Sequence, residues 1–261
     1  MQFIRLISQG PDHAFFNMAL DEAIAESVRE KLSPPTLRFY QWERPSISIG
    51  YFQKASDVNL DYCGKKGFPL VRRLTGGRAI LHDEELTYSL SSYTGSTLFK
   101  DCLIETYTVI SNALLRGLQL NGIHARISFR KKRSEHHNNP SCFTSMSFGE
   151  ITANKKKIIG SAQKRYKNGF LQHGSLLLGF NADELRHALT EIGPDDLSRI
   201  GSIREWSSGI TVDQLRRSLK EAFEKELNVK LVSDVPSTAE LKAADKLVKT
   251  KYSTDEWNFM R

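Results

Sequence analysis

The sequence predicts an α+β fold in which a mixed, mostly antiparallel sheet is flanked by helices. Strand-like patterns follow one another directly, helical patterns stand between these groups, and few β–α–β alternations occur. Hydrophobic residues make up 39% of the 261 residues and charged residues 26%, a balance that supports one large core. We therefore expect a single domain over 1–261, with 205–261 as a candidate small helical C-terminal lobe.

The first half of the chain opens with a predicted strand that turns polar after eight residues, unlike a signal peptide. Residues 12–31 then carry apolar residues at helical spacing, and Asp12 is placed to cap that helix. The remaining elements follow from period-two patterns broken by Pro45, Gly50 and a Gly-Gly turn. We expect strands at 36–43, 46–52, 69–74 and in the second half of 75–93, and a short helix at 58–66.

The second half begins with an amphipathic helix that an Asn-Gly pair ends. A hairpin is expected around Ala153-Asn154, because two strand patterns meet there. Helical patterns close the chain. The expected helices span 104–122, 182–191, 211–226 and 237–250, the strands 124–128, 148–165 (the hairpin) and 169–180, and an exposed loop 130–140.

The chain carries a formal net charge of +7, with denser basic clusters at 130–133 and 155–157. Such a charge favours an anionic partner, of which an acidic protein fits best, although a solvated basic surface explains it equally well. Nucleic-acid motifs and apolar runs of 18 residues are both absent from the sequence, so we expect neither nucleic-acid nor membrane binding.

Three cysteines, Cys63, Cys102 and Cys142, cannot all pair and show no CxxC spacing, which argues against a disulfide framework or a cysteine-rich zinc site. A cytoplasmic, reduced protein is expected. The adjacent His136 and His137 lie in a polar stretch and are typical of solvated residues, so no metal is expected.

The segment RRLTGGRAILH (72–82) holds the first candidate binding residues. Gly76 and Gly77 permit close approach of the backbone to a ligand, while Arg73 and Arg78 add positive charge and His82 follows on a strand. The pattern is neither a Walker A loop nor GxGxxG. On spacing alone, a plain hairpin turn explains it as well.

The segments KIIGSAQKR (157–165) and LQHGS (171–175) each place a glycine beside a small hydroxyl residue. Such pairs can frame a narrow cleft. Taken singly each is weak evidence, and His173 alone is more typical of a hydrogen-bonded strand residue than of a catalyst.

Together RRLTGGRAILHDEELTYS, KIIGSAQKR, LQHGS and the ending KYSTDEWN resemble the biotin/lipoate protein ligase superfamily, specifically its lipoate-attachment branch. The resemblance runs from about Asn17 to Trp257 and implies an α+β catalytic domain around a mixed sheet. Within the branch it implies an octanoyl-[acyl carrier protein]:protein N-octanoyltransferase of the type whose cysteine lies upstream of the KIxGSAQ strand, because PSCF stands there.

Two alternatives remain open in this branch. An ATP-dependent lipoate ligase acts through an acyl-adenylate and needs no cysteine, but its glycine motif commonly has a third glycine where this chain has Arg78. A lipoyl-domain octanoyl amidotransferase uses a similarly placed cysteine, but its glycine motif usually departs further from TGGRA.

The resemblance assigns the chemistry to Cys142 and Lys157. A thiolate can exchange with an octanoyl thioester, and a lysine amine of the acceptor can then take the acyl group. A free thiol is mostly protonated at neutral pH, so an ammonium beside it is needed, and Lys157 matches the family's catalytic lysine. Lys164 is the rival on strand alternation. Cys63 and Cys102 are expected to be structural.

The resemblance also implies a set of substrate-binding residues and partners. Octanoyl-acyl carrier protein is the expected donor, and a lipoyl-domain protein such as the glycine cleavage H protein the acceptor. No cofactor is expected, and the chain is expected to be a monomer. The expected tunnel walls are Leu74, Ile80, Ile159 and Ala162. The expected substrate-binding residues are Arg73, Thr75, Gly76, Gly77, Arg78, His82, Gly160, Ser161, Ala162, His173 and Gly174.

Overall fold

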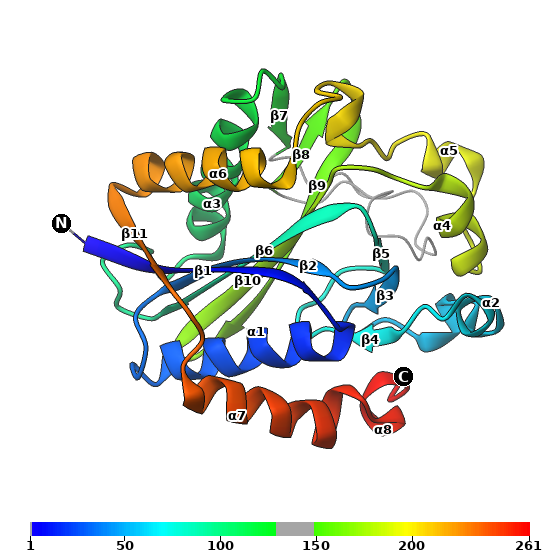
Figure 1. The fold of residues 1–261 in the computed structure, drawn as a ribbon, viewed down its shortest axis with the longest axis horizontal. Coiled ribbons are helices and arrows are strands. Elements are labelled where there is room, and N and C mark those ends of the chain that lie inside the picture. Colours follow the sequence, from blue (N-terminus) through cyan, green and yellow to red (C-terminus); the bar gives the residue numbers. More distant parts are fainter. Residues whose placement is uncertain (1, 129–148) are drawn as a thin grey trace.

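A computed structural model describes residues 2–128 and 149–261 of the chain. Within these ranges eight strands form one twisted sheet in the order β11-β1-β2-β6-β10-β9-β8-β7 (Figure 1). The strands are β1 (Gln2–Asp12), β2 (Thr36–Trp42), β6 (Glu85–Tyr93), β7 (Ala125–Ser128), β8 (Glu150–Ala153), β9 (Lys156–Tyr166), β10 (Gly169–Leu177) and β11 (Val229–Asp234).

The pairing of this sheet is parallel at one end and antiparallel elsewhere. β1 pairs in parallel with both β11 and β2, and every later pair from β2–β6 to β8–β7 is antiparallel. The predicted mixed, mostly antiparallel α+β fold is therefore confirmed. The predicted hairpin at Ala153-Asn154 is present, and Asn154 and Lys155 adopt the positive φ angles that its two-residue turn needs.

A smaller sheet of three strands, in the order β4-β3-β5, lies beside the large one in the described chain. Its strands are β3 (Ser46–Ile49), β4 (Leu70–Arg72) and β5 (Ile80–His82). Its apolar side chains pack with those of α2 (Leu60–Lys66), α4 (Ala182–Ala188) and the short α5 (Pro194–Leu197). The turn between β4 and β5 carries the Thr75-Gly76-Gly77 motif.

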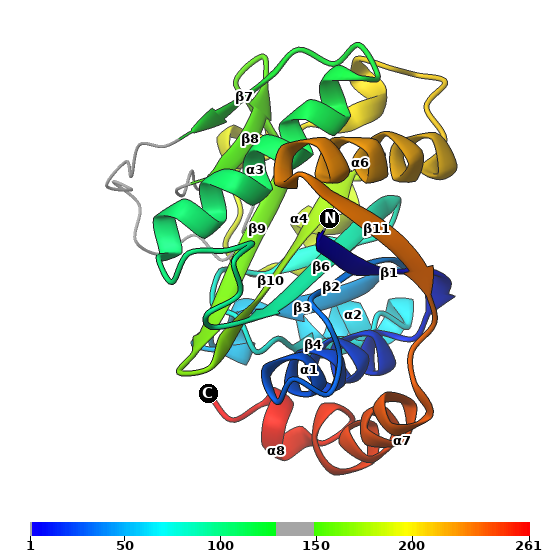
Figure 2. The ribbon, with the colours of Figure 1, turned by 90° about the vertical axis from the view of Figure 1, so that its left-hand side faces the viewer.

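Helices cover both faces of the large sheet (Figure 2). One face packs against α3 (Leu103–Gln119) and α6 (Val212–Leu227), and the other against α1 (Ala14–Arg29), which α7 (Thr238–Leu247) covers in turn. Strand alternation divides the core accordingly: Leu37 faces α3 and α6, whereas Tyr40 faces α1. The N-cap of α1 is His13, one residue after the predicted Asp12, because the His13 side chain accepts the hydrogen bond from Phe15 N–H.

Residues 205–261 add more than helices to the fold. β11 joins the edge of the large sheet beside β1, as the orange and dark blue strands of Figure 1 show. A π-helical turn η3 (Val248–Tyr252) and the short α8 (Asp255–Asn258) follow α7. The prediction of helices here omitted this strand, and the division into a domain and a lobe stays a prediction. Among the described residues, no helix is both long and apolar enough to cross a bilayer.

The crossing of α3 and α6 depends on a glycine. A Cβ on Gly117 would lie 2.6 Å from a methyl of Leu219 and 3.3 Å from its Cα, and Leu219 is fully buried. We expect Gly117→Val to lower the free energy of unfolding by about 1–3 kcal/mol through overpacking. Urea denaturation followed by circular dichroism measures the change.

Gly64, in the exposed part of α2, is the matched control because a Cβ there meets nothing within 4 Å. Gly64→Val should change the free energy of unfolding by at most about 0.5 kcal/mol. Equal losses in the two variants would contradict the tight helix crossing.

Candidate functional site

A pocket lies where α1, the small sheet and the α1 side of the large sheet meet. Apolar and aromatic side chains line much of it, and the indole of Trp42 stacks on the imidazole of His82 with ring centroids 3.8 Å apart. The lining residues are Met18, Tyr40, Trp42, Arg73, Ile80, His82, Thr87, Gly160, Ser161, Ala162, His173, Gly174 and Ser175. Seven of the predicted binding residues are therefore brought together: Arg73, His82, Gly160, Ser161, Ala162, His173 and Gly174.

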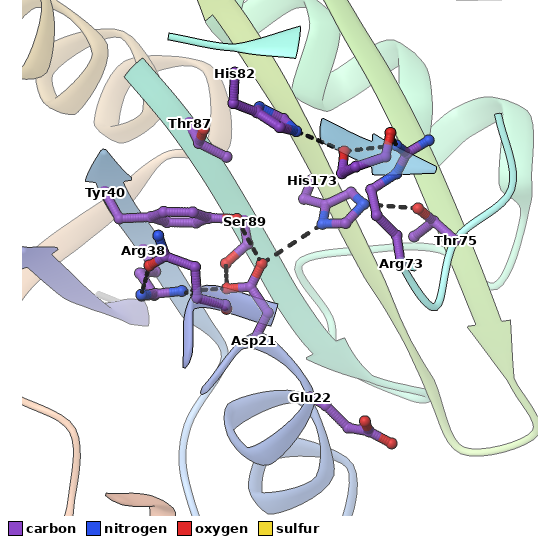
Figure 3. A network of polar contacts seen from close by, with 12 residues as sticks. Asp21, Glu22, Arg38, Tyr40, Arg73, Thr75, His82, Thr87, Ser89 and His173 are labelled. Carbon is purple, nitrogen blue, oxygen red and sulfur yellow. Dashed lines mark hydrogen bonds and ion pairs between the residues drawn. The ribbon is translucent and has the colours of Figure 1, made fainter. Parts of the chain in front are cut away.

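A buried carboxylate, Asp21 of α1, anchors the polar side of this pocket (Figure 3). Its Oδ1 accepts hydrogen bonds from Arg38 (2.7 Å) and Ser89 (2.7 Å), and its Oδ2 accepts one from the Tyr40 hydroxyl (2.9 Å). Burial alone raises the pKa of Asp21, but the charge of Arg38 and the hydrogen bonds outweigh it, so the pKa lies below its usual value. Asp21 is therefore a stable carboxylate at neutral pH.

His173 connects this carboxylate to the glycine turn. Its Nδ1 lies 3.5 Å from Asp21 Oδ2, and its Nε2 lies 2.6 Å from the hydroxyl of Thr75. Burial lowers the pKa of His173, more than Asp21 raises it, so the ring is neutral at pH 7. Because a carboxylate only accepts, Nδ1 carries the proton and Nε2 accepts from Thr75.

A second hydrogen-bond network, centred on His82 and Glu85, lies beside the Asp21–His173–Thr75 network. Glu85 accepts from His82 Nδ1 at 2.8 Å, and His82 Nε2 lies 2.5 Å from the hydroxyl of Ser48. Glu85 also accepts from the hydroxyls of Thr87 and Ser175. All of these residues are buried, so the network holds His82 in one orientation against Trp42.

Arg73 connects the His82–Glu85 network to the glycine turn. Its guanidinium donates to the hydroxyl (2.7 Å) and carbonyl (2.8 Å) of Ser48, and to the carbonyls of Gly76 (3.2 Å) and Arg78 (3.0 Å). Gly77 has a φ of 95°, a conformation that a side chain disfavours. Thr75, Gly76 and Arg78 are therefore tied to the pocket by their hydrogen bonds to His173 and Arg73, and Gly77 lies between them in the turn, although none of the four lines the pocket.

Gly174 is required by close packing behind the pocket. A Cβ there would lie 2.6 Å from both the Tyr88 ring and the carbonyl of Gly160, and 2.7 Å from the Ser161 hydroxyl. The Tyr88 hydroxyl pairs with that of Ser161 at 2.7 Å, and burial raises the pKa of Tyr88 to about 12. The phenol thus stays protonated and keeps β9 and β10 in register with β6.

Lys157 of β9 is almost fully buried and forms an ion pair with Glu150 of β8. It does not contribute to the lining of the pocket described above. Lys164, the rival, is half-buried on the same strand, with its Nζ 5.2 Å from the centroid of the Tyr51 ring. Cys142 lies outside the described residues, as do His136 and His137. The pairing of Cys142 with either lysine therefore stays a prediction.

Of the other two cysteines, one has the buried placement expected of it. Cys63 is buried within α2, as expected, and burial raises the pKa of its thiol to about 11. Cys102 was also expected to be a buried structural thiol, but it is exposed at the surface just before α3. Of the four expected tunnel walls, Ile80 and Ala162 line the pocket. Leu74 does not, and Ile159 packs instead in the core that faces α3 and α6.

Sequence reasoning missed the buried partners that fix the two histidines. Asp21 sits in an otherwise apolar helical pattern, and an acid on that face was a usable signal. Glu85 stands in a strand pattern three residues after His82, which was a weaker one. Ser48 and Tyr40 gave no signal, since small polar and aromatic residues are common in strands.

In the described chain no group of three His, Cys, Asp or Glu residues could hold a metal ion.

Known proteins resemble this chain over nearly its whole length. The LipM octanoyltransferase of Bacillus cereus is 37% identical over 98% of this chain and 97% of its own. The crystal structure of a lipoate-protein ligase A bound with ATP superimposes with a TM-score of 0.84, at 30% identity and 99% coverage of both chains. A bipartite lipoate protein ligase of Thermoplasma acidophilum gives 0.83, at 27% identity, over 99% of this chain and 97% of that one.

A family model described as the lipoyl protein ligase A/B catalytic domain matches residues 13–224. This range contains the hydrogen-bond networks of His173 and His82, the glycine turn and the pocket. It also contains Cys142 and Lys157. The chain therefore belongs to the lipoyl protein ligase A/B catalytic domain family.

Proposed function

We propose that this chain moves an octanoyl group from octanoyl-acyl carrier protein to a lysine of a lipoyl domain, through a thioester on Cys142. Its full-length similarity to an octanoyltransferase identifies the chain as an octanoyltransferase of protein lipoylation. The donor, the acceptor and the thioester residue belong to the proposal, as do a cytoplasmic location and a monomeric state.

The observation that carries the proposal is the pocket behind the glycine turn. It is lined by Met18, Trp42, Ile80 and other apolar surface, and its polar groups converge at one side. An eight-carbon chain gains about 0.8 kcal/mol for each buried CH₂, which favours octanoyl over short acyl groups. The glycine turn would leave room for the thioester carbonyl at the mouth of such a pocket.

Two transfers complete the reaction. The Cys142 thiolate attacks the octanoyl carbonyl carbon, and the C–S bond to the carrier thiol breaks. The acceptor lysine then attacks the same carbon as a free amine, forms the amide, and gives up a proton as the Cys142 thiolate leaves. An amide is more stable than a thioester, so no ATP is needed.

In this scheme Lys157 supplies the positive charge and Glu150 keeps that charge in place. A buried ammonium without a counter-charge would be strongly disfavoured, and the ion pair with Glu150 offsets that cost. A protonated Lys157 favours the thiolate of Cys142 at neutral pH. Glu150 follows directly on the segment that contains Cys142.

His173 and His82 both act on the wall of the pocket. The neutral His173 accepts from Thr75 and so ties β10 to the turn. His82, held by Glu85, presents its ring face to Trp42. Both therefore fix the shape of the acyl site.

An ATP-dependent ligase is the second candidate, because one structural relative is a lipoate-protein ligase A bound with ATP. A third is an amidotransferase, which would share the thioester but take octanoyl from one lipoyl domain for another. The acceptor class itself has support in the bipartite Thermoplasma acidophilum ligase, whose structural study includes its E2 lipoyl domain. The experiment below distinguishes all three by the carrier that is supplied and by the presence or absence of ATP.

Cys142 should become acylated without ATP. Incubation with octanoyl-acyl carrier protein should add one octanoyl group, removable by hydroxylamine, as intact-mass spectrometry would show. Cys142→Ala should lose both the adduct and at least about 10³-fold of the turnover, because the nucleophile is gone.

The matched controls are Cys63→Ala and Cys102→Ala, which should retain the adduct. Full turnover in Cys142→Ala would sink the thioester route. Turnover that requires ATP would favour the ligase, and acylation only by an octanoylated lipoyl domain would favour the amidotransferase.

Lys157 should activate Cys142 at neutral pH. Removing the lysine alone would break a buried ion pair, which costs about 3–5 kcal/mol, so the test pairs Lys157→Met with Glu150→Gln. With Cys63 and Cys102 replaced by Ala, this double variant should react with iodoacetamide much more slowly at pH 7, and nearly normally at pH 9.5, where the thiol ionises without help.

Lys164→Ala is the control, and it should change the pH–rate profile less. A profile shifted only in Lys164→Ala would mean that the other lysine serves the thiol.

The lowered pKa of His173 should make the fold weaker in mild acid. The unfolded chain takes up a proton near the ordinary pKa of 6.5, whereas the folded chain resists it. The contribution is complete above pH 6.5 and is lost as the pH falls toward the lowered pKa, by at most about 1.4 kcal/mol for each pH unit.

Urea titrations from pH 7.5 to 5 would measure this slope. His173→Gln should be less sensitive to pH than the wild type, and a variant of the exposed His124, His124→Gln, should match the wild type. Equal slopes in all three proteins would refute a buried neutral His173.

A further inference from the structure

The segment KYSTDEWN (251–258) packs along the open edge of the small sheet. β4 pairs with β3 on one side. On its other side, side chains of this C-terminal segment serve as the hydrogen-bond partners of β4. Asn258 Oδ1 accepts from Arg72 N–H at 2.8 Å, and Trp257 Nε1 donates to the Arg72 carbonyl at 3.0 Å. Both backbone polar groups of Arg72 are thereby satisfied by side chains of this segment.

The guanidinium of Arg72 is fully buried and is surrounded by backbone carbonyls. On one side it donates to the carbonyls of Trp257 (3.2 Å) and Asn258 (2.8 Å). On the other it donates to those of Gly50 (2.9 Å), Tyr51 (3.2 Å) and Gln53 (2.5 Å). One side chain therefore joins the C-terminal segment to the loop after β3.

The loop after β3 also contacts the Thr75–Gly77 turn directly. A Cβ on Gly50 would lie 1.9 Å from the Gly77 carbonyl oxygen, so the two backbones are in direct contact. Tyr51 N–H donates to the Thr75 carbonyl at 2.9 Å. Thr75 is the residue whose hydroxyl meets His173 in Figure 3.

The C-terminal segment is itself held at two further points. Asn258 Nδ2 donates to the carbonyls of Tyr252 (2.8 Å) and Thr254 (3.1 Å), which closes the segment on itself. Glu22 of α1 accepts from Lys251 (2.8 Å) and from the Tyr252 hydroxyl (2.7 Å). The segment is thus fastened to the helix that carries Asp21.

We propose that residues 251–258, acting through Asn258 and Arg72, are a positioning element that fixes the Thr75–Gly77 turn against the pocket. Neither Arg72 nor Asn258 lines the pocket. Arg73, the next residue, reaches the pocket itself, so adjacent arginines serve the two sides of one turn: Arg73 from within and Arg72 from behind.

Hydrogen–deuterium exchange tests the positioning directly and needs no activity. In Asn258→Ala, amide exchange in the peptide over 74–79 should rise by roughly tenfold, since losing a buried hydrogen-bonding group costs about that factor in an equilibrium constant. Glu256→Ala, a change of an exposed residue on the same short helix, should leave that peptide unchanged. Faster exchange confined to 249–261 would overturn the proposal.

Two further variants keep the test decisive if Asn258→Ala folds poorly. Trp257→Phe removes the indole donor to Arg72 and keeps an aromatic ring at that position. Arg72→Lys replaces a planar five-donor group by a point charge that cannot reach all the carbonyls. Both should raise exchange at 74–79 by a smaller factor, in folded protein as judged by circular dichroism. Unchanged exchange at 74–79 in both would also overturn the proposal.

A kinetic measurement, which rests on the proposed function, asks whether the turn serves the acyl site. Asn258→Ala should raise the KM for octanoyl-acyl carrier protein by about tenfold and leave kcat within about a factor of two. General instability would do the reverse, because it lowers the concentration of active enzyme and not its affinity. A wild type that transfers no octanoyl refutes the proposed function, and the exchange result then decides the positioning role alone; an unchanged KM in an active enzyme overturns that role.

Discussion

The carboxylate of Asp21 is the charge around which this side of the molecule is assembled. It lies on α1, and its donors come from β2 and β6, while His173 of β10 faces it. A carboxylate buried this deeply would be costly without such donors. Since the donors stand on three adjacent strands, the helix can dock in only one rotation and one height on the sheet.

The buried guanidinium of Arg38 is stabilised by several partners besides Asp21. Beyond Asp21 its guanidinium donates to the side chain and carbonyl of Asn17 and to the side chain of Gln9, and it stacks on the Tyr40 ring. Charge, planarity and aromatic contact all act on the same few atoms. The result is a rigid polar layer beneath an apolar pocket. Such a layer can hold His173 in one tautomer without exposing it to water.

Most of the fold could be predicted because its patterns are local. The period of 104–122 gave α3, and the turn at Ala153-Asn154 gave the β8–β9 hairpin. β11 was missed, because six residues between two strong helices carry little pattern and their partner, β1, is more than two hundred residues away in the chain. The split of the strands into two sheets was missed for the same reason: it depends on pairing between distant segments.

The site divides in a similar way. Motif residues such as Arg73 and His173 could be found from the sequence, because glycine and hydroxyl residues around them form a readable pattern. Their partners Asp21, Glu85 and Ser48 lie on other elements, and only the tertiary fold brings them close to these motif residues. Ile159 was placed in a tunnel wall because one strand residue cannot be assigned a face without its register. Here a bulge shifts the β8–β9 pairing between Ile151 and Thr152.

The position of β11 has a consequence for how the protein is made. The strand that borders β1 belongs to the last eighth of the chain, so a nascent polypeptide emerging from the ribosome presents β1 with an unpaired edge until residues 229–234 have been synthesised. Unpaired edges recruit other strands, and pairings between distant segments form slowly. Cotranslational folding of this protein therefore has a vulnerable interval that ends only when the final strand arrives, and during it chaperones or slow dilution should matter most.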